Sequence, residues 1–146
     1  MFLTVALLGC HEAAADSEKP LAPHEQLVRE FIQAFNTRDL GALLERADEE
    51  IEWQSFDGAS VAVEARGKAA LRASLERYFS DCPTCQSALE WVASTSSRVV
   101  ALERVSWTGN GGPRAQSSLS VYEFRGGKIL RVLYFPAEPT ATVPPP

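Results

Sequence analysis

Two apolar runs flank a pair of adjacent glycines in residues 121–135, and this segment most constrains how the chain can fold. Gly126 and Gly127 can adopt the positive φ angles of a tight reversal, so the flanking runs are predicted to pair as a β-hairpin. The second run is apolar on both faces of the strand it would form. Such a strand needs cover on both sides, and we expect helices on one side and a second subunit on the other.

The turn also fixes the expected register of the hairpin. With Phe124 opposite Ile129, Tyr122 is predicted to face Arg131. The other expected pairs are Ser120 with Leu133, Val121 with Val132, and Leu119 with Tyr134. In this register Leu133 and Phe135 face the expected subunit partner.

Composition indicates one ordinary globular domain. The chain has 146 residues, of which 45% are hydrophobic and 23% charged, enough for a single core. The formal net charge of −5 is spread along the sequence, and no basic stripe is present. We therefore expect no nucleic-acid partner.

The N-terminus has the composition of an export signal. Residues 2–9 are apolar or small, a run far shorter than the roughly 20 residues of a membrane-spanning helix. Leu7-Leu8-Gly9-Cys10 resembles a bacterial lipobox, which implies lipidation of Cys10 and a membrane anchor. The alternatives are an ordinary cleaved signal and an apolar N-terminus without function.

This resemblance implies a cellular location as well as a membrane anchor. Residues 1–10 would be the signal and residues 11–23 a tether. His11, rather than aspartate, follows the cysteine, which implies the outer membrane, on the periplasmic side of a bacterial cell envelope. Because no basic residue precedes the apolar run, we expect the natural start to lie upstream.

The C-terminus is rich in proline. Residues 136–146 hold five of the nine prolines, which cannot donate to a strand ladder. We expect the sheet to end there, with residues 138–146 forming a disordered tail.

Between the two ends, hydrophobic periodicity predicts three helices and then a series of strands. Pro23 suits the first turn of an amphipathic helix over 23–36, Asp39 can cap a second short helix, and Gly67 precedes a third. Strands are expected over 51–56, 89–93, 99–107, 116–124 and the second half of the hairpin. This order predicts an α+β fold with helices on one face of a curved, mostly antiparallel sheet.

Four short motifs resemble the SnoaL-like branch of the NTF2-like superfamily, over about residues 24–137. They are Phe35-Asn36-Thr37-Arg38-Asp39-Leu40, Ile51-Glu52-Trp53, Gly67-Lys68-Ala69-Ala70-Leu71 and Tyr122-Glu123-Phe124-Arg125-Gly126-Gly127-Lys128-Ile129. The resemblance implies an NTF2-like cone, in which three N-terminal helices pack on the sheet and leave a pocket. Many members form homodimers through the outer sheet face.

The same resemblance argues against ketosteroid isomerase chemistry, which needs a carboxylate base and an oxyanion hole. The family's catalytic tyrosine falls on Phe31, its base near Gln54 or Ser55, and its hairpin aspartate on Ser120. SnoaL-like cyclases often carry an acid or histidine near the last strand, where this chain has Tyr134. Because the superfamily also contains binding and association domains, the fold does not supply a function.

Glu103 and Tyr134 are the candidate catalytic residues. Val99, Ala101 and Val105 share a strand face with Glu103, and burial among them would raise its pKa. The simpler interpretation, which we favour, is that Glu103 faces outward and pairs with an arginine. Arg104 would then face the pocket and suit an anionic ligand.

The expected pocket is lined mainly by aromatic side chains, as small-molecule sites commonly are. The expected lining residues are Phe31, Trp53, Trp91, Glu103, Arg104 and Tyr134. Aromatic residues at strand spacing are also typical of a plain core.

The cysteines predict a local disulfide. With Cys10 lipidated, Cys82 and Cys85 remain, and an oxidising compartment favours a bond between them. The only histidines are His11 and His24, so we expect neither a metal site nor a cofactor.

Three functions are compatible with these features. The first is an envelope lipoprotein whose domain binds a small, partly apolar ligand without catalysis. The second is a SnoaL-like isomerase, cyclase or hydratase that uses a pocket carboxylate. The third is a dimerising adaptor with a filled cavity.

Overall fold

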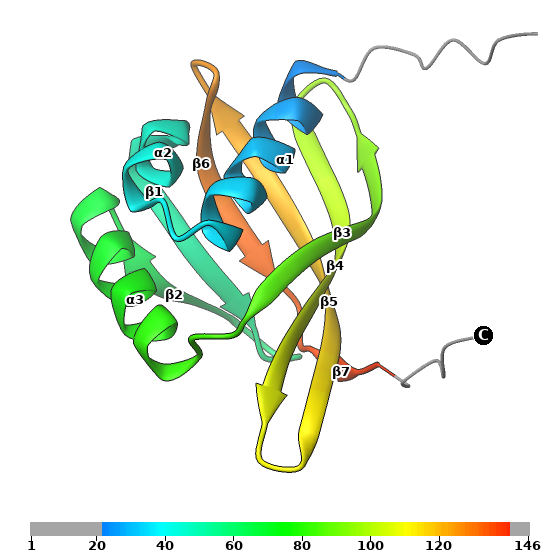
Figure 1. The fold of residues 1–146 in the computed structure, drawn as a ribbon. Helices are drawn as coiled ribbons and strands as arrows, with labels where there is room; N and C mark the ends of the chain where they lie inside the picture. Colours follow the sequence, from blue (N-terminus) through cyan, green and yellow to red (C-terminus); the bar gives the residue numbers. More distant parts are fainter. Residues whose placement is uncertain (1–21, 141–146) are drawn as a thin grey trace, which may run out of the picture.

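The computed structural model describes residues 22–140, and Figure 1 shows one α+β domain. Along the chain it contains α1 (Pro23–Asn36), α2 (Leu40–Arg46), β1 (Ala47–Phe56), β2 (Val61–Arg66), α3 (Lys68–Asp81), β3 (Gln86–Ser94), β4 (Arg98–Gly109), β5 (Gly112–Arg125), β6 (Lys128–Tyr134) and β7 (Glu138–Pro139). The predicted signal, the lipidation site Cys10 and most of the tether lie outside the described residues. Within 22–140, no helix is long and apolar enough to cross a membrane.

The strands form one sheet in the order β2-β1-β6-β5-β4-β3, in which β1 and β6 are parallel and the other neighbours antiparallel. The three helices lie on the same side of this sheet (Figure 1). The predicted α+β fold, with three helices on a mostly antiparallel sheet, is confirmed.

The predicted helices form for the expected local reasons. Pro23 lies in the first turn of α1, and the apolar stripe of this helix buries Val28 and Phe31. The Asp39 carboxylate caps α2 by accepting a hydrogen bond from the Ala42 amide at 2.9 Å. The core thus lies between α1 and the inner face of the sheet.

The predicted hairpin register is right at the turn and wrong beyond it. Phe124 pairs with Ile129 as expected, but Glu123 then pairs with Arg131, so Leu130 is an extra residue on β6. Such a β-bulge shifts the remaining register by one residue. The observed pairs are Tyr122 with Val132, Val121 with Leu133, and Ser120 with Tyr134.

Two further expectations are corrected at the sheet edges. β2 was not predicted, because most of its residues are exposed and its hydrophobic alternation is weak. The sheet also continues past Pro136, since β7 pairs with β5 through Glu138 and Pro139. Proline is tolerated there because a short edge strand leaves one side unpaired.

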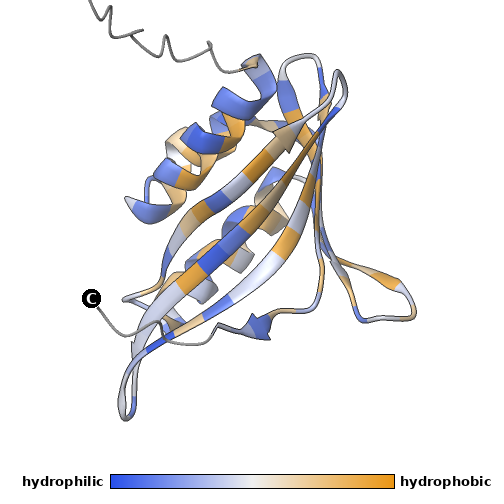
Figure 2. Cartoon of the chain, turned by 90° about the vertical axis from the view of Figure 1, so that its right-hand side faces the viewer, coloured by the Kyte–Doolittle hydropathy of each residue, from blue (hydrophilic) through white to orange (hydrophobic). Residues whose placement is uncertain are grey.

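The outer sheet face carries a ladder of alternating charges. Arg66, Glu52, Arg131, Glu123 and Arg98 come from five adjacent strands, β2 to β4, and each forms an ion pair with the next. Hydrophilic and hydrophobic positions alternate along the long strands in Figure 2. The sheet exterior is therefore partly polar and partly apolar.

Candidate functional site

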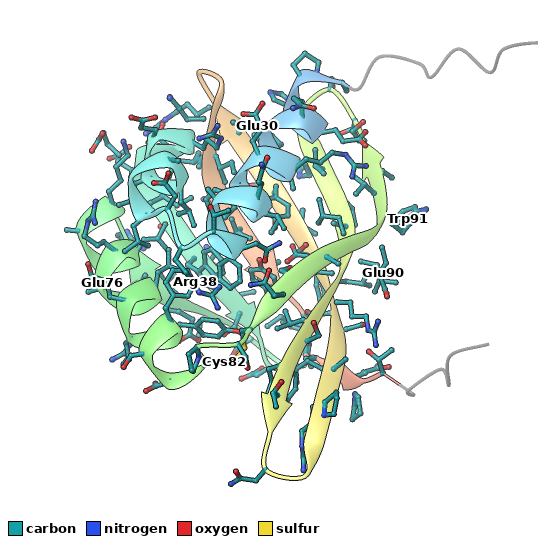
Figure 3. The ribbon with its side chains drawn as sticks, viewed as in Figure 1. Glu30, Arg38, Glu76, Cys82, Glu90 and Trp91 are labelled. Atoms are coloured by element: carbon teal, nitrogen blue, oxygen red, sulfur yellow. A yellow bond between two sulfur atoms is a disulfide. The ribbon has the colours of Figure 1, made fainter. Side chains whose placement is uncertain are left out.

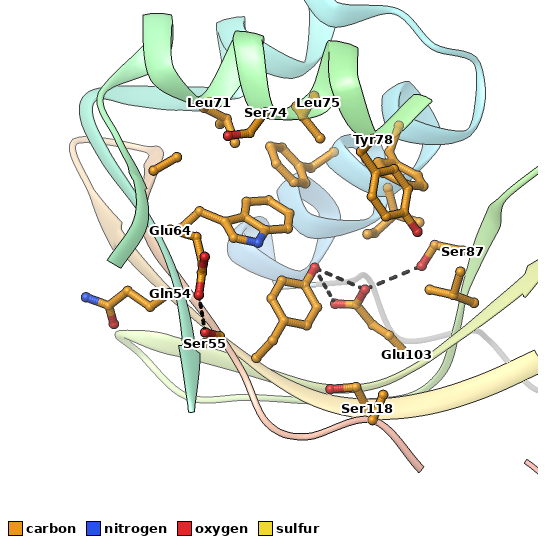
Figure 4. A pocket seen from close by; sticks show the side chains of 18 of the residues that line it. Gln54, Ser55, Glu64, Leu71, Ser74, Leu75, Tyr78, Ser87, Glu103 and Ser118 are labelled. Atoms are coloured by element: carbon orange, nitrogen blue, oxygen red, sulfur yellow. Dashed lines mark hydrogen bonds between the residues drawn. The ribbon is translucent and has the colours of Figure 1, made fainter. Parts of the chain in front are cut away.

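A cavity of about 390 Å³ lies between the helices and the inner face of the sheet. Its apolar walls come from α1, α3, β1 and β6, and include Phe31, Leu71, Leu75, Trp53 and Tyr134. In Figure 4, Leu71, Ser74 and Tyr78 project from α3 toward the strands. The volume is within the range of about 300–1,000 Å³ typical of small-molecule sites.

The carboxyl group of Glu103 is the polar centre of this cavity. It is only 3% exposed, and four hydroxyl groups surround it. Ser120 donates to Oε1 at 2.5 Å and Tyr122 donates to the same oxygen. Tyr134 donates to Oε2 at 3.2 Å and Ser87 to Oε2 at 3.4 Å. These four donors match the four lone-pair positions of a carboxylate.

Burial controls the ionisation of this cluster. Desolvation raises the pKa of the Glu103 carboxyl above its ordinary value, and hydrogen bonds from the surrounding hydroxyls offset this only in part. Burial, followed by the charge of Glu103, also raises the pKa values of Tyr122 and Tyr134 well above the ordinary value for tyrosine. Both tyrosines therefore stay protonated and act as hydrogen-bond donors at neutral pH.

The expectation that Glu103 faces outward is wrong, because the helices cover its face of β4. Val99 and Ala101, four and two residues earlier on β4, are fully buried against these helices, and strand alternation turns Glu103 the same way. Arg104 consequently faces away from the cavity, with its Nε 3.9 Å from a Glu90 carboxylate oxygen.

Of the expected lining residues, Phe31, Trp53, Glu103 and Tyr134 lie on the cavity. The assignment of Arg104 and Trp91 to the pocket is corrected, since neither lines it. Trp91 is 54% exposed and projects outward beside Glu90 (Figure 3). The β3–β4 register shifts between Leu89 and Trp91, an irregularity that local sequence did not reveal.

Sequence reasoning named Tyr134 but missed Ser87, Ser120 and Tyr122 as the other hydroxyl partners of Glu103. Ser120 and Tyr122 are two residues apart on β5, so both side chains point to the inner face of the sheet. This spacing could have predicted that they lie together. No spacing in the local sequence predicts that Ser87 joins this group. Its position depends on Asn36 at the end of α1, whose amide forms two hydrogen bonds with the Ser87 main chain.

Polar groups also occur elsewhere on the cavity lining. Ser55 on β1 donates to Glu64 on β2 at 2.5 Å, as the dashed line in Figure 4 shows. Arg77 of α3 lines the cavity as well. Residues 22–140 contain no group of three or more histidine, cysteine, aspartate or glutamate side chains placed to hold a metal ion.

A disulfide joins Cys82 to Cys85, with 5.5 Å between their Cα atoms, as predicted. It connects the end of α3, a cavity wall, to the start of β3, which carries Ser87. Arg38 reinforces this connection by donating to the Cys85 and Pro83 carbonyl oxygens at 2.6 and 3.1 Å. Cys82 lies near the end of α3 in Figure 3.

The SnoaL-like domain family matches residues 28–132, most of the chain. The chain belongs to this family. A comparison with curated proteins gives no significant match.

Solved structures with the same fold include NTF2-like proteins, which confirms the predicted NTF2-like fold. Bal32a, from a soil-derived mobile gene cassette, is 24% identical, with a TM-score of 0.66 over 77% of this chain and 87% of that one. A putative polyketide cyclase from Xanthomonas campestris is 22% identical, with a TM-score of 0.61 over 78% and 90%. TerC, crystallised with polyporic acid, is 18% identical, with a TM-score of 0.65 over 77% and 90%.

In this SnoaL-like domain, the acid of the cavity comes from β4 rather than from β5. Ser120, the position expected for an isomerase aspartate, instead donates a hydrogen bond to Glu103 from the neighbouring strand. Phe31, Gln54 and Ser55 all lie on the cavity, where none provides a carboxylate. The cavity thus has one buried carboxyl group, that of Glu103 on β4, and not at the position on β5 where an isomerase carries its aspartate.

Proposed function

We propose that this SnoaL-like domain binds a small, flat, largely apolar molecule, and that Glu103 and Tyr134 hold one of its oxygen atoms. The observation that carries this proposal is the buried Glu103 carboxyl with its hydroxyl partners on an open cavity. Small-molecule sites commonly combine apolar walls with a few convergent polar groups of this kind.

The aromatic walls favour a flat ligand. The Trp53 and Tyr134 rings are stacked with centroids 5.0 Å apart, and Phe31 lies 6.3 Å from Trp53. Ring faces arranged in this way present flat apolar surfaces, against which a conjugated or polycyclic ligand can stack. This arrangement also contradicts the filled-cavity adaptor, because the space beside the rings is open.

The polar centre favours a ligand oxygen that accepts hydrogen bonds. A neutral Glu103 can donate its own proton to the Tyr134 oxygen, which frees the Tyr134 hydroxyl hydrogen to turn toward the ligand. The raised pKa of Glu103 favours this neutral form. A carbonyl or quinone oxygen would complete the chain of hydrogen bonds.

A ligand screen with two tryptophan variants tests this proposal. Calorimetry with flat aromatic ketones and phenols should give binding to the wild type that Ser74→Trp abolishes, since Ser74 lines the cavity. The control, Ser80→Trp, changes an exposed residue of α3 outside the cavity and should bind normally. Failure of every compound to bind, or equal binding by both variants, would contradict the proposal.

Proton-transfer catalysis of the isomerase, cyclase or hydratase type is the second candidate, favoured by the raised pKa of a carboxyl group on an open cavity. Binding ranks first because burial favours the neutral form of Glu103, which carries its own proton and must lose it before it can accept one from a ligand. Glu103→Gln should abolish turnover and preserve binding if catalysis occurs. Unchanged turnover would exclude Glu103.

We also propose that the domain forms a homodimer through its outer sheet face. Leu119 is 47% exposed on this face and pairs with Leu102, which in turn pairs with Trp91. This apolar row crosses three strands, and burying it would stabilise a dimer. Light scattering should give twice the chain mass, and Leu119→Glu should halve it. A monomeric wild type would refute the dimer.

For the ends of the chain, we propose a signal over 1–10 and a tether that leads to α1 at Pro23, with the domain ending at β7 rather than before it. A lipid on Cys10 would anchor the domain to the outer membrane on the periplasmic side. Metabolic labelling with a fatty-acid analogue should label the wild type and not Cys10→Ala. Equal labelling of both would exclude this anchor.

A further inference from the structure

We infer that the ligand of this cavity carries one anionic group, held by Arg77 at the α3 wall, in addition to the neutral oxygen held at Glu103. This inference rests on the proposed function, because it concerns the same cavity. The ligand class is then a flat aromatic or polycyclic monoacid, such as an aromatic carboxylate with a hydroxyl or carbonyl group at its other end.

Arg77 differs from every other described arginine and lysine. Within residues 22–140, nine of these side chains form ion pairs. They are Arg29, Arg46, Arg66, Lys68, Arg72, Arg98, Arg104, Arg125 and Arg131. Arg38, Arg114 and Lys128 donate hydrogen bonds to main-chain carbonyl oxygens. Arg77 does neither within that range, and it is the cation on the cavity lining.

The position of an unpaired guanidinium beside apolar walls points to an anion from outside the protein. Guanidinium groups bind carboxylates through paired, charge-assisted hydrogen bonds. Because Arg77 is exposed, water screens part of that attraction, and the expected gain is that of a single exposed contact. The carboxylate of Glu64 also lines the cavity, but it accepts a hydrogen bond from Ser55 and forms no ion pair with Arg77.

Glu103 sets the orientation of such a ligand. An anion beside Glu103 would meet a like charge whenever Glu103 is ionised, and that repulsion costs free energy. A neutral oxygen meets no such penalty there. The anionic group therefore belongs at Arg77 and the neutral oxygen at Glu103 and Tyr134, with the flat body of the ligand against the Trp53 ring.

Three probes test the charge preference by calorimetry: hydroxynaphthoic acid, its methyl ester and the corresponding aminomethyl naphthol. The wild type should bind the acid on the order of tenfold more tightly than the ester, the effect of one charge-assisted contact. It should bind the amine least. Arg77→Gln should remove the difference between acid and ester without weakening the ester.

The matched control is Arg72→Gln on the same helix, since Arg72 does not line the cavity and lies near Glu76. This variant should keep the preference for the acid. Equal affinity of the wild type for acid and ester, or equal effects of the two substitutions, would overturn the inference and leave the proposed function intact. If no probe binds, or if Ser74→Trp leaves probe binding unchanged, the proposed function fails and this inference fails with it.

Discussion

The side-chain amide of Asn36 both donates a hydrogen bond to the main chain of Ser87 and accepts one from it. Its Nδ2 donates to the Ser87 carbonyl oxygen and its Oδ1 accepts from the Ser87 amide, each at 2.8 Å. The pair resembles the contact between neighbouring strands and joins the end of α1 to the start of β3. It thereby holds the Ser87 hydroxyl toward Glu103.

Asn36→Ala should destabilise the domain and loosen the start of β3. Two partly buried main-chain groups lose their partners, which costs about 1–3 kcal/mol for each group left without a substitute. Urea unfolding gives the change in the free energy of unfolding. Gln26→Ala, which removes an exposed hydrogen bond to Glu30 on α1, is the control and should change it little. Equal losses in the two variants would contradict this role for Asn36.

Glu103→Gln should change how stability depends on pH. Because the folded pKa of Glu103 is raised, its stabilising contribution is fully present below the unfolded value of about 4.3 and is lost as pH rises through the folded pKa. Between the unfolded and the folded pKa of Glu103, the free energy of unfolding of the wild type should therefore fall by about 1.4 kcal/mol per pH unit relative to that of the variant. Urea unfolding across pH measures this difference. A difference that stays constant, or that changes in the opposite direction, would show that the pKa is not raised.

Reduction of the Cys82–Cys85 bond should have a modest effect. The bond closes a loop with a sequence separation of only 3, for which loop entropy gives about 2 kcal/mol. Hydrogen exchange should show faster exchange at the end of α3 and the start of β3, with the remaining sheet unchanged. Mass measurement with and without a reductant provides the control for the redox state. Global unfolding on reduction would mean that the bond does much more than connect these two elements.

Glu123→Gln should weaken the charge ladder on the outer face. Desolvation raises the pKa of Glu123, but hydrogen bonds from Arg98 and Arg131 outweigh it, and the net pKa is lowered. The contribution of this ionised carboxylate is present above its unfolded pKa and is lost as pH falls through the folded one. We expect a loss of about 1 kcal/mol at low salt and less at high salt. Glu90 is the control, because its carboxylate lies 3.9 Å from Arg104 and outside the ladder. Glu90→Gln should lower the free energy of unfolding by less than Glu123→Gln. A larger decrease for Glu90→Gln would refute the role of the ladder.

The helices and most strands were predictable because their signals are local. The apolar periodicity of 23–36, the capping carboxylate of Asp39 and the glycines after Arg125 each act within a few residues. The bulge at Leu130 has no such signal, because it depends on how β6 fits between β1 and β5. The register error therefore began at the first position where tertiary packing decided the pairing.

The direction of Glu103 could not be predicted for a related reason. β4 is apolar on both faces, with Val99 and Ala101 on one and Val100 and Leu102 on the other. Local alternation establishes that Glu103 and Arg104 face opposite ways and does not say which faces the helices. Packing of α1 against Val99 and Ala101 decides it.

The most direct test of a buried, ligand-facing carboxyl group is carbon NMR of the Glu103 side-chain carboxyl during a pH titration, with and without a flat aromatic ligand. We predict a pKa above the ordinary glutamate value of about 4.3 in the free protein. We also predict a clear change in its chemical shift when hydroxynaphthoic acid is added. An ordinary pKa together with no response to any ligand that binds would contradict the account.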